Sequence, residues 1–136
     1  MKKSVWLASL LFLVLGLQAN SGKELFVQKC SMCHIMTKAK DSIKLVAPPA
    51  IGIVYHLRHR FKSDNLVKKH IVNFVIKPNK KTSLKKAVKK FGLMPSQKNS
   101  VTEKELNAIA DWMLQHYHMT EKEHKQMEKH EHLKSK

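Results

Sequence analysis

The stretch Cys30-Ser31-Met32-Cys33-His34 is the most informative part of this sequence. It holds the only two cysteines of the 136 residues, three positions apart, with a histidine directly after them. Residues three apart lie on the same face of a helical turn, so both thiols can reach one side of a bound group. A disulfide between them would close so small a loop that it would hardly constrain the unfolded chain. The stretch therefore indicates a binding site.

The pattern Cys-x-x-Cys-His is typical of covalent attachment of haem c. Two thiols on one face match the two vinyl groups on one edge of a porphyrin, and the adjacent imidazole can bind the iron. We therefore predict one haem c per chain, bonded to Cys30 and Cys33 and ligated by His34. A thioredoxin-like redox pair would need a strand–helix context that is missing here. A zinc site would need a fourth ligand, which one of three later histidines could supply: His56, His59 or His70.

The N-terminus has the pattern of an export signal. Lys2 and Lys3 precede an apolar run over residues 5–17, and a small residue, Ala19, follows it. We predict a signal peptide over residues 1–19, one domain over 20–117, a charged His-rich tail over 118–136, and a periplasmic location. The apolar run is shorter than the about 20 residues that a membrane span needs, so an uncleaved anchor is the less favoured alternative.

The apolar periodicity predicts an all-α fold, because helical patterns recur and no strand pattern stands out. A short helix is expected within 22–33, and another over 63–76, with Ser63 as a cap candidate and Pro78 as its end. The clearest helix is expected over 102–117, where Thr102 and Glu105 form a capping-box pattern. The lysine-dense stretch 80–90 is expected to hold a short helix. Residues 47–52 and 91–95 are expected to be irregular, and 53–61 is of mixed character.

From about Gly22 to Tyr117 the chain resembles the class I cytochromes c, which carry one haem and are soluble. The attachment motif is the specific part of this resemblance. It implies a small cytochrome c fold in which the N- and C-terminal helices cross around one covalently attached haem. Gly22 and Phe26 resemble the N-terminal helix pattern of the family, and Ile109 and Trp112 resemble residues of its C-terminal helix. Glycine would allow the two backbones to approach, and the aromatic side chains would fill the crossing.

The second axial ligand must come from the opposite haem face. Most methionines of the mature chain lie beside the motif, within the last helix or in the tail: Met32, Met36, Met113, Met119 and Met127. Met94 remains, between Gly92 and Pro95, and it resembles the methionine ligand of the family, which often precedes a proline. The alternatives are a Met94 that only packs its loop and a bis-histidine site with His70 or His56. His/Met ligation would leave no open iron position, so we expect electron transfer and not an enzyme.

The segment Ala47–Gly52 resembles the Gly-Pro segment that follows the haem motif in the family. There, a proline carbonyl accepts a hydrogen bond from the second ring nitrogen of the proximal histidine. The resemblance gives this role to Pro48, because its spacing from Gly52 fits better than that of Pro49, although Ala47 stands where glycine is common. Such a bond would fix the tautomer of His34 and strengthen its bond to iron.

The composition is strongly basic, with 26 Lys and Arg against 10 Asp and Glu and a formal net charge of +16. Nucleic acid would be the usual partner for such a charge, but the export signal argues against it. A run of lysines without acidic residues precedes Met94: Lys77, Lys80, Lys81, Lys85, Lys86, Lys89 and Lys90. We expect it to dock an acidic redox partner, such as a membrane-bound oxidase or reductase, and the protein to be a monomer. Peripheral contact with anionic membrane is the alternative use.

The tail contains histidines at irregular spacings: His118, His124, His130 and His132. Such a polar segment is expected to be disordered or a solvated helix, with opportunistic metal affinity. The sequence thus predicts a periplasmic one-electron carrier. The alternative is a haem- or metal-binding sensory or delivery module that uses an open iron site or the tail.

Overall fold

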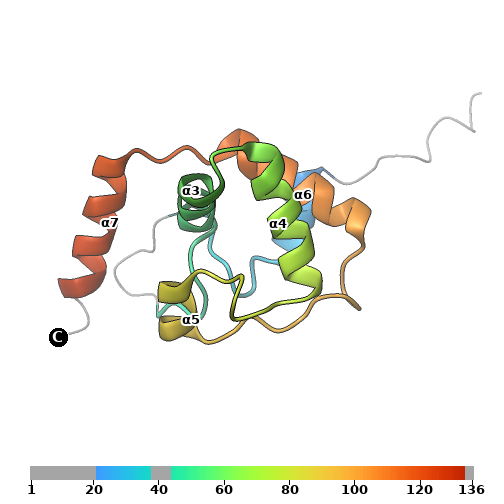
Figure 1. Cartoon of the computed structure of the whole chain (residues 1–136), viewed down its shortest axis with the longest axis horizontal. Helices are drawn as coiled ribbons and strands as arrows, with labels where there is room; N and C mark the ends of the chain where they lie inside the picture. Colours follow the sequence, from blue (N-terminus) through green and yellow to red (C-terminus); the bar gives the residue numbers. More distant parts are fainter. Residues whose placement is uncertain (1–20, 38–43, 134–136) are drawn as a thin grey trace, which may run out of the picture.

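The computed structural model describes residues 21–37 and 44–133, and the predicted signal peptide over 1–19 lies outside them (Figure 1). The described residues form helices and no strands: α2 (Gly22–Lys29), α3 (Ala50–Phe61), α4 (Asp64–Ile76), α5 (Lys85–Phe91), α6 (Glu103–His116) and α7 (Glu121–Leu133). The predicted all-α fold is therefore confirmed. Within the described ranges, no helix has the length and apolar character needed to cross a membrane.

The crossing of α2 and α6 depends on Gly22. A Cβ atom built on Gly22 would lie 2.2 Å from the carbonyl oxygen of Ala108 and 2.6 Å from Cβ of Trp112. Both distances are far below van der Waals contact, so only glycine lets the two backbones approach this closely. The rings of Phe26 and Trp112 fill the crossing, with centroids 5.4 Å apart. The predicted contact between the first and last helices of the cytochrome-like domain is confirmed.

Matching capping boxes start these two helices. The Thr102 hydroxyl accepts from the Glu105 N–H, and the Glu105 carboxylate accepts from the Thr102 N–H. Ser21 and Glu24 form the same pair of bonds at the start of α2. Lys29 joins the two helices, because its ammonium donates to the carbonyl oxygen of Ser100 at 2.7 Å and lies 3.4 Å from the Glu105 carboxylate. The starts of α2 and α6 are therefore both fixed by side chains.

The core lies where α3 and α4 pack on α6. The buried stripe of α6 is Leu106, Ile109, Ala110, Met113 and Leu114. Val54 and Leu57 of α3 and Val67 of α4 are likewise almost fully buried. Arg58 ties the end of α6 to α3 by donating to the carbonyl oxygens of Leu114 (2.7 Å) and Tyr117 (2.6 Å). A cation at these carbonyls also suits the negative end of the helix dipole.

Helix α3 begins earlier than the sequence predicted. The segment 47–52 was expected to be irregular because of its prolines, but Pro49 is the N-cap and the helix starts at Ala50. The fixed φ of proline is compatible with a helix start, where its missing N–H costs no hydrogen bond. Helix α5 in turn begins at Lys85, since residues 80–83 form turns held by Arg60, which donates to the carbonyls of Thr82 and Ser83.

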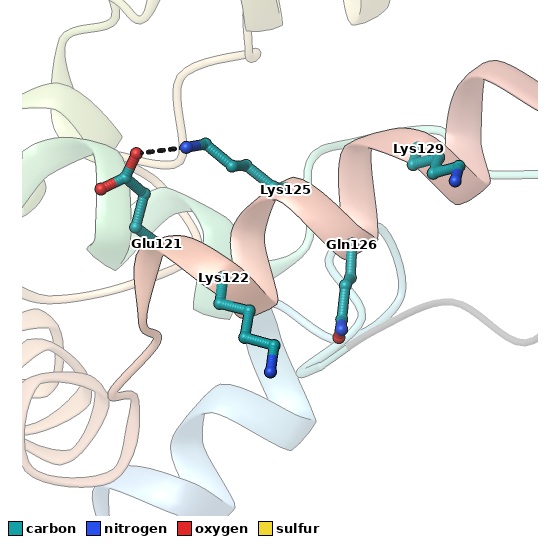
Figure 2. Close-up of a pocket in the computed structure, with 5 residues that line it drawn as sticks. All are labelled: Glu121, Lys122, Lys125, Gln126 and Lys129. Atoms are coloured by element: carbon teal, nitrogen blue, oxygen red, sulfur yellow. Dashed lines mark ion pairs between the residues drawn. The ribbon is translucent and has the colours of Figure 1, made fainter.

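The tail forms helix α7, which lies beside α3 (Figure 1). A capping box of Thr120 and Glu123 starts it. The sequence left disorder and a solvated helix open, and the described part of the tail is helical with two different faces. Figure 2 shows the outer face, a shallow hollow between the side chains of Glu121, Lys122, Lys125, Gln126 and Lys129. The inner face carries His124, which is only 8% exposed.

Candidate haem-attachment site

The attachment motif lies on a turn that continues from the end of α2. The N–H of Cys30 donates to the carbonyl oxygen of Phe26 at 2.8 Å, and the N–H of His34 donates to that of Cys30 at 2.9 Å. Both cysteines are free thiols. Cys33 is exposed, whereas Cys30 is half-buried against the hydrophobic core. The crossing of α2 and α6 therefore sets the position of the motif.

The environment of Cys30 argues against the redox alternative, and the lack of a further ligand nearby among the described residues argues against the zinc alternative. Burial raises the pKa of the Cys30 thiol to about 11, and the neighbouring Cys33 adds to the effect. Reactive cysteine pairs have lowered thiol pKa values, the opposite of the shift at Cys30. In the part of the chain that the structure describes, no group of three or more His, Cys, Asp or Glu side chains could hold a metal ion. His56, His59 and His70 therefore do not complete a zinc site with the cysteines.

His34 is oriented by a backbone carbonyl. Its Nδ1 lies 2.8 Å from the carbonyl oxygen of Pro48. A carbonyl can only accept, so Nδ1 carries the proton and Nε2 keeps the lone pair that a metal needs. The contact is made by Pro48 and not by Pro49, and it is the contact that the family resemblance implied. The structure thus brings Cys30, Cys33, His34 and Pro48 together.

The start of α3 explains why Pro48 faces His34. The first N–H groups of a helix have no partner within the helix. Here the N–H of Ala50 donates to the carbonyl oxygen of Ile35 at 2.8 Å, and that of Ile51 donates to Met36 at 3.1 Å. The helix start is thereby fastened to the segment that follows His34. This clamp was not predicted, because its partners are far apart in the sequence and their side chains take no part in it.

Met94 lies on a separate loop after α5 and is half-buried. Gly92 ends α5 with a positive φ of 82°. The loop is then fastened to the end of α4, because the N–H of Gln97 donates to the carbonyl oxygen of Val75 at 3.0 Å and the Ser96 hydroxyl donates to that of Ile76. Met113 is a core residue at 4% exposed and is unsuitable as a ligand, as expected.

The histidines that could compete with Met94 are held in other contacts. Nε2 of His56 lies 3.1 Å from Nε2 of His124 on α7. His70 lies between Phe61 and Phe74, with ring centroids 5.0 and 5.5 Å away. Burial, followed by the charge of Arg60, lowers the pKa of His70. These contacts weaken the case for a bis-histidine site.

The lysine run before Met94 is on the surface. All of its members are exposed: Lys77, Lys80, Lys81, Lys85, Lys86, Lys89 and Lys90. Lys90 lies over the ring of Phe91, 5.1 Å from its centroid, and Lys86 lies 3.5 Å from the Glu128 carboxylate on α7. The run therefore forms a basic surface on α5 and the turns before it.

Comparison with known proteins gives a family match that covers more than half of the chain. The family model described as cytochrome c oxidase, cbb3-type, subunit III, matches residues 17–113. Neither the curated proteins nor the solved structures gave a match. The matched range contains the attachment motif, helix α2, most of α6 and the Met94 loop. The chain therefore belongs to the cbb3-type cytochrome c oxidase subunit III family and carries a c-type cytochrome domain of the kind that serves haem-based electron transfer.

Proposed function

We propose that this protein is a periplasmic one-electron carrier with a single haem c, bonded to Cys30 and Cys33 and ligated by His34 and Met94. The observation that carries the proposal is the 2.8 Å contact between Nδ1 of His34 and the carbonyl oxygen of Pro48. It leaves Nε2 of His34 as an iron donor beside two unpaired thiols, and this donor set fits haem c. When bound, the haem supplies a one-electron Fe(III)/Fe(II) couple.

Pro48 serves this function through His34. Its carbonyl fixes the ring orientation and the tautomer, and it makes Nε2 more basic, which strengthens the bond to iron. The clamp from Ala50 and Ile51 to residues 35 and 36 keeps the carbonyl in place. A carrier gains from such rigidity, because a site that changes little between oxidation states exchanges electrons quickly.

Met94 is proposed as the second axial ligand. A thioether is a soft, neutral donor that favours Fe(II), so His/Met ligation raises the reduction potential. Two protein ligands leave no position for a substrate, which is why we propose a carrier and not an enzyme. The fastening of the loop to α4 by Ser96 and Gln97 supports a fixed position for Met94.

The proposed partner is an acidic redox protein that docks on the basic surface of α5. The name of the family points to an oxidase as the electron acceptor. Exposed lysines around a docking site speed the encounter with an anionic partner and make it sensitive to salt. The periplasmic location rests on the export pattern of residues 1–19.

Absorption spectroscopy tests the ligation. The protein is co-produced with the c-type maturation machinery, and its intact mass and its oxidised and reduced spectra are recorded. We expect one covalent haem per chain and a weak near-infrared sulfur–iron band that disappears in Met94→Ala. Met119→Ala is the control, because Met119 is also partly buried but lies outside the domain. A near-infrared band that persists in Met94→Ala would reject Met94, and a chain without covalent haem would reject the whole proposal.

A further inference from the structure

Two histidines meet between α3 and α7, away from the attachment motif. Nε2 of His56 lies 3.1 Å from Nε2 of His124, and the two rings are perpendicular. Tyr55 orients both rings, since it stacks on His124 with centroids 4.3 Å apart and contacts His56 edge-on at 5.4 Å. His124 is 8% exposed on a helix that is otherwise very polar. Such convergence of two ring nitrogens requires an explanation beyond packing.

The surroundings of His56 favour its neutral form. Burial, followed by the proximity of His124, lowers the pKa of His56, while Lys86 and His59 act in the same direction and Glu128 opposes them. A neutral imidazole keeps a lone pair on one nitrogen, and neutral imidazole is the common ligand of divalent transition metals. The two Nε2 atoms are close enough for one ion to reach both, once the proton that they share is released to water.

The distances suit one metal ion between the rings. Zinc binds histidine at about 2.0–2.1 Å with tetrahedral angles, which places two ligand nitrogens about 3.3 Å apart. The observed 3.1 Å differs from this value by a small side-chain movement. The other ring nitrogen of His124, Nδ1, lies 4.0 Å from the Glu128 carboxylate. In many metal sites the second nitrogen of a histidine donates to a carboxylate, and a side-chain shift of about 1 Å would bring Glu128 within that distance.

We propose that His56 and His124 form a site for a divalent transition metal of the zinc class, which links α7 to α3. In the described ranges no third side chain joins them, so water completes the coordination. The ion takes the place of the hydrogen bond between the rings and holds the C-terminal helix on the domain. The site lies outside the haem motif, and the proposal does not depend on the electron-carrier function.

Zinc titration of the haem-loaded full chain tests the site. Calorimetry is expected to show one saturable site, and removal of zinc by a chelator should reverse binding. His56→Gln and His124→Gln should each weaken it by more than about 10-fold, because even the loss of a group that only orients a ligand costs that much. The exposed His59 and His118 are the controls, and their Gln variants should bind zinc as the wild type does. Equal losses in all four variants would mean diffuse affinity of the histidines and overturn the proposal.

A ligand exchange separates metal binding from simple packing. His124→Cys removes the imidazole but keeps a zinc ligand, so it should bind zinc more tightly than His124→Gln does. Amide hydrogen exchange gives the second measurement. Zinc should slow exchange over α7 in the wild type and in His124→Cys, and should leave it unchanged in His56→Gln. Zinc binding that survives His56→Gln, or protection of α7 without it, would refute the link between the two helices.

Discussion

Gly22→Ala tests the helix crossing that positions the attachment motif. The added methyl would meet the carbonyl oxygen of Ala108 at 2.2 Å and Cβ of Trp112 at 2.6 Å. A relaxed contact needs at least 3.4 Å or so, so α2 would have to move by about 1 Å against backbone that cannot yield. Overpacking of this kind usually costs about 1–3 kcal/mol, and we expect the upper end because no flexible side chain can move aside.

Gly52→Ala is the matched control, since Gly52 is also a helical glycine and is even more buried than Gly22. Its added Cβ would meet only Cε of Met127, at 3.5 Å, which is ordinary contact. Alanine favours a helix interior over glycine by about 0.8–1.0 kcal/mol, so this variant should be neutral or more stable.

Thermal unfolding of the haem-loaded protein measures both variants. For a domain of this size, a loss of 1 kcal/mol lowers the melting temperature by about 4–8 °C, so Gly22→Ala should melt about 10 °C or more below the wild type. Equal stability of Gly22→Ala and wild type would refute the close approach of α2 and α6. Destabilisation of both variants by the same amount would mean that any helical glycine here is sensitive to substitution. That result would refute the explanation from the close contact at Gly22.

Three further predictions concern the end of α6, the basic surface of α5 and the docking of α7. Arg58→Met should lower the unfolding free energy by about 1–3 kcal/mol, because the carbonyls of Leu114 and Tyr117 lose their donor and Asp64 loses its ion pair. Chemical denaturation measures this loss. Lys85→Glu with Lys89→Glu should slow electron transfer to the anionic oxidant hexacyanoferrate(III) by about 10-fold at low salt, whereas Lys23→Glu should have little effect, as stopped-flow would show. The pKa of His56 is lowered while α7 is docked, so its neutral form is favoured there. Docking should therefore be intact above about pH 6.5 and weaken as the pH falls below it. Faster amide hydrogen exchange over α7 in metal-free buffer would show this weakening.

Local patterns predicted much of the fold. Thr102 and Glu105 mark a helix start within four residues, and the apolar stripe that follows repeats with the helical period. Gly22 and Trp112 were identified through the family resemblance, and the attachment motif is contiguous in the sequence. Ser21 and Glu24 form the same capping pattern as Thr102 and Glu105, so this start could have been found by the same rule.

Contacts between distant segments could not be predicted from the sequence. The clamp between the start of α3 and residues 35 and 36 uses backbone groups only, and no side-chain pattern indicates it. The contact of His124 with His56 spans 68 positions, and a polar tail gives no sign of which histidine is buried. The proposed axial role of Met94 likewise rests on its loop and its neighbours, since half-burial of a methionine is compatible with packing as well as with ligation.

The unclear periodicity of residues 53–61 has a physical cause in the way α3 is covered. On a helical wheel, Val54 and Leu57 point to the core formed with α4 and α6, whereas Gly52 and His56 lie on the opposite side. That opposite side is covered by α7, through Met127 over Gly52 and His124 against His56. A helix covered on both sides has no simple apolar stripe, especially when one cover is aliphatic and the other consists of imidazole and phenol rings. His56 is thus an interface residue between α3 and α7, and the helix that presents Pro48 to His34 also carries the C-terminal helix.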